Sequence, residues 1–338
     1  MILSMPAPRH FSRRDFFVVP ALGRSKAADF WVRVNREIMA CRFEVVLPGE
    51  RAEATPVARE ALDYADRLEG VMTIFREGSD LSHVNREAHV APVPVDHELF
   101  RVLELAAAIH HRTDGAFDIT SAPLSRCWGF LRRDGRIPSS EQIASALAHV
   151  GMCHVRLDSD SCTVGFDREG VALNLGAIGK GFALDRMAQF IRARGVHQAL
   201  LSAGASSILG FGGGDEPWPV DLTSAVTGQR LARLHLDSGA VGTSGAGEQF
   251  FEADGVRYGH VIDPRSGWPA AGVLSASVIT SDAASADALS TAFLIGGPAM
   301  AERYCARHPG VLALITPDDG SHRPLQFGSY GGVKVHGV

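Results

Sequence analysis

The sequence has 338 residues, a length that suits one large domain or two closely associated ones. Its 46% hydrophobic and 21% charged residues are ordinary for a globular protein and exclude a disordered or fibrous chain. A formal net charge of −5 gives no long-range attraction for nucleic acid, so we expect no nucleic-acid partner and only local recognition of phosphate. The widely spaced cysteines, without a Cys-x-x-Cys pair, favour neither a disulfide framework nor a thiolate zinc site.

Residues 1–30 form a basic leader that we expect to be mobile. Within it, Ser12-Arg13-Arg14-Asp15-Phe16-Phe17 has the form of a twin-arginine export signal, but a short apolar run follows it. The compartment is therefore open between periplasm and cytoplasm, with a slight preference for export. No later run is long enough to span a bilayer, so we predict no stable membrane insertion. Residues 31–338 are expected to form a single domain with one or two lobes.

The first half of the chain carries helix signals. Arg42–Pro48 is predicted to be a strand, and Val57–Met72 a helix. Asp96 is placed to cap a second helix, and Ser139 followed by Gln142 has the pattern of a capping box for a third. The apolar residues at helical spacing are Ala61, Leu62, Ala65, Leu68 and Met72 in the first helix, and Leu99, Val102, Leu103, Ala106 and Ile109 in the second.

The second half is richer in strands. Helices are expected from about Phe182 to Arg194 and from about Ala284 to Ile295. Because strands and helices do not alternate strictly, the predicted fold class is α+β. The short strand candidates are His154–Leu157, Thr163–Phe166, Val171–Leu175, Ala199–Ser202, Pro219–Leu222, Arg233–Leu236, Gly259–Ile262, Leu274–Ile279 and Leu312–Ile315.

A glycine-rich segment, 174–181, lies where a strand is expected to end and a helix to begin. Glycines there allow backbone N–H groups to approach an anion, the helix N-terminus adds positive potential, and Lys180 supplies a full charge. The segment can be a phosphate cradle or a plain strand–helix turn. It is not a Walker A loop, because no Ser or Thr follows the lysine.

Asp287 and Thr291 lie four residues apart near the start of the last predicted helix, so they share one face. A carboxylate and a hydroxyl, completed by a backbone carbonyl and phosphate oxygens, suit a hard cation such as Mg²⁺ and offer little to zinc. The alternative is that Asp287 only caps the helix.

Two other segments contain side chains suited to catalysis or ligand binding. His260, in Tyr258–Gly267, can be a general base or a hydrogen-bonded structural histidine. The loop Thr113–Asp118 has two carboxylates, and Trp128 and Phe130 follow it. These aromatic groups can hold a ligand ring or close the core.

Taken together and in this order, these segments resemble the ApbE family of FAD:protein FMN transferases, from about Met39 to Gly297. The resemblance implies an α+β fold that is strand-rich, with T-fold-like halves and flanking helices. The motifs that carry it are the Met39 segment, Ile74–Arg76, Ser79–Ser82 with Asn85, Thr113–Asp118, Leu175–Gly181, Thr243–Gly245, His260–Pro264 with Gly267, and Ala286–Thr291.

The resemblance also implies a reaction and a site. FMN would pass from FAD through its phosphate to a Thr or Ser hydroxyl of an acceptor protein, with release of AMP. The backbone oxygen of Ala177 would join Asp287 and Thr291 around Mg²⁺, and His260 would lie close to the reacting phosphate as its catalytic base. The residues implied to line the FAD site are Met39, Phe75, Ala116, Phe117, Asp118, Asn174, Lys180 and Ile262.

The chain departs from the family pattern at three places. Phe75 stands where the family often has Tyr, Asn174 where it often has Asp, and Gly204–Ser206 where it often has Gly-Gly-Asp or Gly-Gly-Glu. Loss of the phenol removes a hydrogen bond but keeps the stacking surface. Asn174 keeps an acceptor oxygen and loses a charge.

Three alternatives accompany this interpretation. An FAD pyrophosphatase would use the same site and pass FMN to water, and a non-catalytic flavin-binding or assembly protein would hold FAD without releasing AMP. A serine hydrolase would use Ser244 with His260 and Asp263. The sequence disfavours the hydrolase, because 242–246 is not a Gly-x-Ser-x-Gly elbow.

Overall fold

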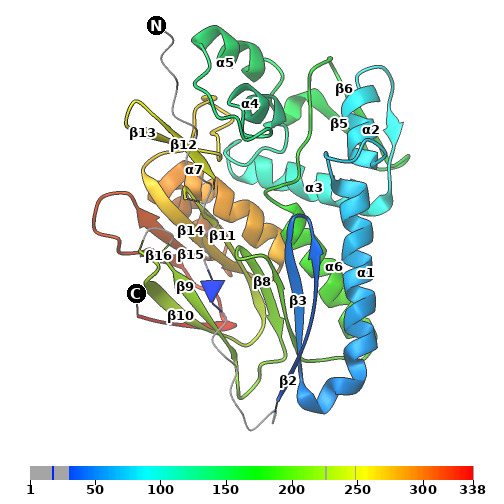
Figure 1. The fold of residues 1–338 in the computed structure, drawn as a ribbon, viewed down its shortest axis with the longest axis vertical. Coiled ribbons are helices and arrows are strands. Elements are labelled where there is room, and N and C mark those ends of the chain that lie inside the picture. The colour runs from blue at the N-terminus through cyan, green and yellow to red at the C-terminus, as the bar shows by residue number, and fades with distance from the viewer. Residues whose placement is uncertain (1–16, 19–29, 225–226, 248, 338) are drawn as a thin grey trace, which may run out of the picture.

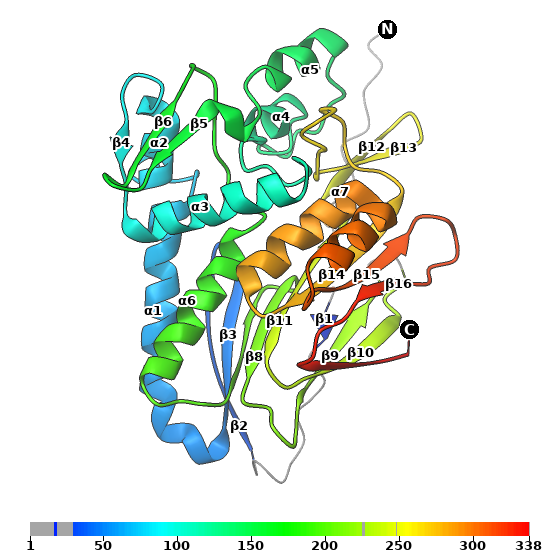
Figure 2. The same cartoon turned by 180° about the vertical axis from the view of Figure 1, so that it is seen from behind.

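The computed structural model describes residues 17–18, 30–224, 227–247 and 249–337. The leader predicted for residues 1–30 therefore lies outside the described residues, except for positions 17, 18 and 30. A central sheet carries the main helices on one face and packs its other face against a smaller sheet (Figures 1 and 2). Within the described part of the chain, no helix has both the length and the apolar character needed to cross a bilayer.

The bounds of the elements confirm a mixed α+β class, and every strand pairing within the described residues is antiparallel. The helices are α1 (Thr55–Met72), α2 (Asp80–Glu87), α3 (His97–Arg112), α4 (Ala122–Cys127), α5 (Ser140–Leu147), α6 (Gly179–Ala193) and α7 (Ala283–Arg307), with 3-10 turns at Gly49–Ala54 and Met152–His154. The strands are β1 (Phe17–Val18), β2 (Trp31–Ile38), β3 (Cys41–Pro48), β4 (Val93–Pro94), β5 (Val155–Asp158), β6 (Thr163–Phe166), β7 (Ala199–Ala203), β8 (Ser207–Phe211), β9 (Trp218–Thr223), β10 (Arg230–Leu236), β11 (Gly239–Gly245), β12 (Phe250–Ala253), β13 (Val256–Gly259), β14 (Val273–Thr280), β15 (Leu312–Pro317), β16 (Leu325–Gly328) and β17 (Val333–His336).

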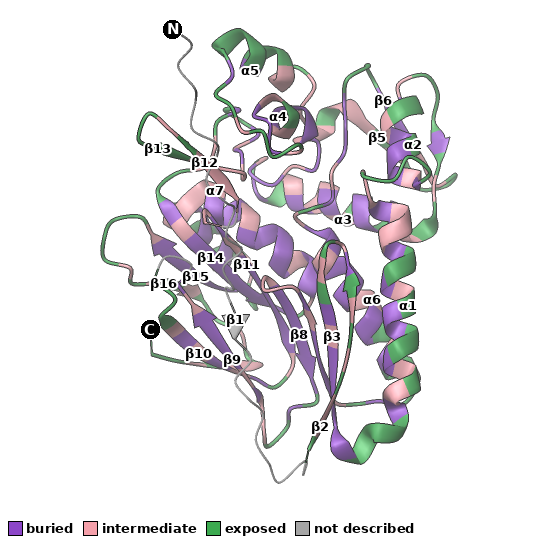
Figure 3. Ribbon diagram, viewed as in Figure 1, coloured by how far each residue is buried: buried purple, intermediate pink, exposed green. Residues whose placement is uncertain are grey.

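The inner strands of the central sheet are buried on both faces. Its strand order is β16-β15-β14-β11-β8-β7-β3-β2, and the smaller sheet runs β1-β9-β10-β17. Val45 and Leu201 belong to the core under the helices, whereas their neighbours Val46 and Leu200 belong to the core shared with the smaller sheet. Because side chains alternate between the faces of a strand, both faces of these strands need apolar residues. Figure 3 shows that the inner strands of the sheet are mostly buried.

The predicted helix signals act as expected. The side chain of Asp96 accepts a hydrogen bond from the Glu98 N–H (2.7 Å), which caps α3. Ser139 and Gln142 form the reciprocal capping box at the start of α5. The five apolar positions predicted for each of α1 and α3 are all buried. Local chemistry therefore sets these helix starts and faces.

Two predicted strands are wrong. Val171–Leu175 forms no strand, because the side chain of Asn85 takes the place of a neighbouring strand: its amide donates to the Leu173 carbonyl (2.9 Å) and its oxygen accepts the Leu173 N–H (2.7 Å). Gly259–Ile262 is mostly not a strand either, since β13 ends at Gly259 and Ile262 makes only an isolated bridge to Pro269.

Helix α7 begins at Ala283, one residue before its predicted start, and it is interrupted at Gly297 (φ 67°, ψ −169°), just after the predicted end at Ile295. A second helical part follows from Pro298 to Arg307. Its cap is Asp282, whose side chain accepts the Ser285 N–H (2.8 Å). Asp185 of α6 accepts the N–H groups of Ala283 (2.7 Å) and Ala284 (2.9 Å), so it joins the two helices. The alternative that Asp287 caps this helix is therefore wrong, because Asp282 is the cap.

A glycine in β11 allows α7 to approach the sheet closely. A Cβ atom at Gly242 would lie 2.5 Å from the carbonyl oxygen of Ala286 and 2.6 Å from the backbone nitrogen of Asp287. Real Cβ contacts do not occur at such distances, so any larger residue would push α7 outward. The first turns of α7, including Asp287, are held against β11 by this contact.

Gly242→Ala should therefore lower the free energy of unfolding by about 1–3 kcal/mol, as overpacking does in well-packed cores. Urea denaturation of the two proteins would measure the difference. Gly331→Ala is the control, because no atom lies within 4 Å of the Cβ position at Gly331. Similar losses in both variants would show that the close approach of α7 is unimportant.

Candidate functional site

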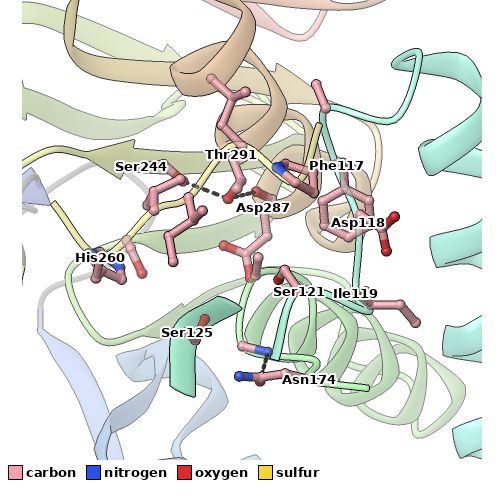
Figure 4. Close-up of a pocket in the computed structure, with 18 of the residues that line it drawn as sticks. Phe117, Asp118, Ile119, Ser121, Ser125, Asn174, Ser244, His260, Asp287 and Thr291 are labelled. Atoms are coloured by element: carbon pink, nitrogen blue, oxygen red, sulfur yellow. Dashed lines mark hydrogen bonds between the residues drawn. The ribbon is translucent and has the colours of Figure 1, made fainter. Parts of the chain in front are cut away.

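A cleft of about 940 Å³, counting the part open to solvent, lies between the start of α6, the first half of α7, β11 and the loop before α4 (Figure 4). Every residue predicted for the site lines this cleft except Met39 and Phe75. In the view of Figure 4, Asp287 lies near the middle, with Ser244 and His260 on one side and Phe117 and Asp118 on the other. The predicted residues that line it are Ala116, Phe117, Asp118, Asn174, Ala177, Lys180, His260, Ile262, Asp287 and Thr291.

Met39 and Phe75 lie elsewhere. Met39 is in the tight turn between β2 and β3, with a φ of 51°. Phe75 is 78% exposed and lines a separate groove that includes Asn85 and Leu173. Asn174, the residue after Leu173, lines the main cleft, so one segment of the chain borders both the groove and the cleft. Contact of Met39 and Phe75 with FAD stays a prediction.

The start of α6 forms a positive end of the cleft. Asn174 Oδ1 accepts the Gly176 N–H (2.9 Å) and shapes the turn before the helix. The helix begins at Gly179, so the glycine-rich segment includes its first turn. Lys180 Nζ donates to the Gly176 carbonyl (3.4 Å) and lies 3.9 Å from Asp287 Oδ2. The positive end of a helix dipole together with an ammonium group suits a phosphate group.

Asp287 is a buried carboxylate, 3% exposed, at the floor of the cleft. Its Oδ1 accepts the Ser207 hydroxyl (3.2 Å) and its Oδ2 accepts the Gly181 N–H (3.2 Å). Gly181 lies in the first turn of α6, where N–H groups have no partner within the helix, so Asp287 satisfies this one. Ala177 precedes the N-cap, Ile178, so its carbonyl takes no part in the hydrogen bonds of α6.

The oxygens of Ala177, Asp287 and Thr291 fit a hard cation. All three residues line the cleft, and a carboxylate, a carbonyl and a hydroxyl are ligand types that Mg²⁺ accepts. Across the described ranges, no three His, Cys, Asp or Glu side chains gather as a metal cluster. A cation at Asp287 would thus need further oxygens from water or a bound phosphate.

His260 is oriented by the backbone. Its ring Nδ1 lies 3.2 Å from the Gln249 carbonyl oxygen, and the backbone N–H of His260 donates to the same oxygen (2.9 Å). Because a carbonyl oxygen only accepts, Nδ1 carries the proton of the neutral ring and Nε2 is the basic nitrogen. Asp263 pairs with Arg265 (2.8 Å), so Ser244, His260 and Asp263 do not form the hydrolase triad.

The aromatic and acidic residues on either side of α4 have two separate roles. Trp128 is fully buried and donates to the Gly267 carbonyl (2.8 Å), so it closes the core. Phe117 and Asp118 line the cleft. Asp118 Oδ1 accepts the N–H (2.7 Å) and hydroxyl (2.6 Å) of Thr120, while Oδ2 lies 3.2 Å from His110 Nδ1. The hydrogen bond with Asp118 raises the pKa of His110 above its ordinary value.

This contact gives a pH dependence of stability. A histidine whose pKa is raised on folding stabilises the fold fully below its unfolded pKa, about 6.5, and the contribution disappears as pH rises through the folded pKa. His110→Gln should therefore lose more stability at about pH 6 than at about pH 9. Urea denaturation of both proteins at each pH would measure this. An equal loss at both pH values would show that the imidazolium is not involved.

The contacts of three hydroxyl groups near the site were not predicted. Ser207 bonds Asp287, and Ser244 contacts both Ser290 and Thr291. Ser244 was considered only as the nucleophile of the disfavoured hydrolase, and Ser290 falls inside a motif compared with the family without a role of its own. Ser207 follows the departure at Gly204–Ser206, and its sequence position gives no sign of its contact with α7.

Comparisons with known proteins identify the family of this chain. A family model described as the ApbE family matches residues 39–315. The FAD:protein FMN transferase of Treponema pallidum is 33% identical over 82% of each chain, and that of Escherichia coli (strain K12) is 29% identical over 84% of each. The ApbE protein of Thermotoga maritima has a TM-score of 0.79 at 31% identity, covering 86% of this chain and 96% of its own. The flavin transferase ApbE of Vibrio cholerae has a TM-score of 0.75 at 25% identity, covering 89% and 97%.

Proposed function

Because the chain belongs to the ApbE family, we propose that it is an FAD:protein FMN transferase that moves FMN from FAD to a Thr or Ser hydroxyl of an acceptor protein and releases AMP. One observation carries the proposal. A positive helix end with Lys180, an oxygen-rich set around Asp287, and the basic nitrogen of His260 meet in one cleft. These are the groups that transfer of a phosphate-linked nucleotide needs.

The chain's own residues divide the work. Lys180 and the positive N-terminal end of α6 hold the pyrophosphate of FAD. His260 Nε2 takes the proton of the acceptor hydroxyl as its oxygen forms a bond to the FMN phosphorus. The bond from that phosphorus to the bridging oxygen breaks, and the electron pair leaves on AMP. The products are an FMN phosphoester and AMP.

Mg²⁺ would be held by the Ala177 carbonyl, Asp287 and Thr291, and when bound it offsets the charge of the pyrophosphate. One of the three family departures, Asn174, lies in the turn before α6. Asn174 uses its oxygen to accept the Gly176 N–H, a task that needs no charge. The turn that precedes Lys180 is therefore maintained without the usual aspartate.

The proposal is tested by incubating the full chain with FAD, Mg²⁺ and a domain that carries a Thr flavinylation site. AMP release and the intact mass of the acceptor are followed together. An FMN-sized gain in mass that disappears with EDTA supports the transferase. AMP without a gain in mass, using an acceptor that a known transferase modifies, supports a pyrophosphatase instead. Bound FAD without AMP supports a binding or assembly protein.

A further inference from the structure

Three hydroxyl groups lie in a row beside the proposed cation site. Ser244 Oγ of β11 is 3.0 Å from Thr291 Oγ1 of α7 (Figure 4). It is also 2.8 Å from Ser290 Oγ on the same helix. Ser290 Oγ in turn donates to the Asp287 carbonyl (2.8 Å). Ser244 and Thr291 line the cleft, whereas Ser290 is fully buried behind them.

The direction of each hydrogen bond follows from a count of protons. A hydroxyl has one proton to donate, and a carbonyl has none. Ser290 gives its proton to the Asp287 carbonyl, so the contact between Ser290 and Ser244 requires Ser244 to donate. Ser244 has then used its proton, so the contact between Ser244 and Thr291 requires Thr291 to donate.

The Thr291 oxygen is left as an acceptor. Its proton points to Ser244 at 3.0 Å rather than to the Asp287 carbonyl at 3.5 Å, the longer of its two contacts. In both arrangements the Thr291 hydroxyl donates its proton to an oxygen of the protein. Only the donation to Ser244 is a short contact, and the chain of hydrogen bonds that it begins ends at the buried Ser290. Cation ligands must present lone pairs, so this orientation suits a metal ligand.

We propose that Ser244 and Ser290 are positioning residues that form a one-way hydrogen-bond chain and present Thr291 to a divalent cation as a pure acceptor. The inference rests on the proposed function, because it gives Thr291 its role as a ligand. It adds two residues that never touch the cation. Groups that orient metal ligands typically change metal affinity by 10–100-fold when they are removed.

Binding of Mn²⁺ alone to the full chain, measured by electron paramagnetic resonance, tests the chain of hydroxyls without turnover. Ser244→Ala and Ser290→Ala should each weaken Mn²⁺ binding about tenfold. Ser290→Ala is the sharper variant, because Ser290 is buried outside the cleft. Without the Ser290 hydroxyl, Ser244 can donate its proton to Thr291, which reverses the direction of the hydrogen bond between Ser244 and Thr291.

The matched control is Ser277→Ala. Ser277 is a buried serine of β14 whose hydroxyl lies 2.7 Å from Thr243 Oγ1, outside the chain to Thr291. It should bind Mn²⁺ as the wild type does. Thermal melting of all variants would show whether each folds.

The outcomes separate the two proposals. If the wild type binds Mn²⁺ and Ser290→Ala binds it equally well, the hydroxyl chain is wrong and the cation site stands. If Ser277→Ala weakens Mn²⁺ binding as much as Ser290→Ala does, the loss comes from looser packing of the core, and the proposed hydroxyl chain is again wrong. If the wild type binds no Mn²⁺, the cation site itself fails.

Discussion

His260→Asn is expected to lower the rate of FMN transfer by about 10²–10⁴-fold while FAD binding stays close to that of the wild type. The side-chain amide of Asn can occupy the place of Nδ1 and donate to the Gln249 carbonyl, which His260 contacts at 3.2 Å. The variant therefore keeps the orienting contact and loses only the basic Nε2. Single-turnover transfer and FAD titration, followed on the same preparation, separate the two effects.

FAD binding gives the control for this variant. Loss of FAD binding in parallel with the rate would contradict the role of a base and make His260 structural.

Asp287→Asn is expected to lower the rate of AMP release by at least about 10²–10³-fold and to remove its response to Mg²⁺. Asp287 is the carboxylate among the three proposed ligands, and it is buried. Asn can still accept the Gly181 N–H and donate to the Ser207 oxygen, so the fold should survive. Initial rates measured across a range of Mg²⁺ concentrations test this, with thermal melting to show folding.

Asp221→Asn is the matched control, because Asp221 is also a largely buried carboxylate but lies in the smaller sheet, paired with Arg233 (2.6 Å). It should reduce stability and leave the Mg²⁺ response unchanged. If Asp287→Asn released AMP normally and still responded to Mg²⁺, the cation would have to bind elsewhere.

The parts of the fold that could be predicted are those with local causes. The caps of α3 and α5 and the buried faces of α1 and α3 depend on neighbours within one or two helical turns. Strand β11 was missed for the opposite reason. Its glycines lower strand propensity, yet Gly242 is required by the approach of α7, a partner that the local sequence does not reveal.

The candidate site likewise has parts with local causes, which the sequence predicts, and parts that depend on distant residues. The pair Asp287 and Thr291 could be found because one helical turn joins them. The contacts that position Asp287 come from Gly181 and Ser207, 106 and 80 residues earlier in the chain. No periodicity connects such positions. The resemblance to a family named most of the lining residues, but the register between β11 and α7 that aligns the hydroxyl groups appears only in the folded structure.

The wide spread of the site along the chain ties ligand binding to folding. The oxygens and N–H groups of the cleft come from segments that extend from Ala116 to Ile295, and they meet only after β11, α6 and α7 have packed together. The unfolded chain therefore has no comparable site, and a bound ligand stabilises the folded state by mass action, by about 2.7 kcal/mol at a concentration of 100 times Kd. The lifetime of this protein in a cell would then depend on the supply of its own substrate.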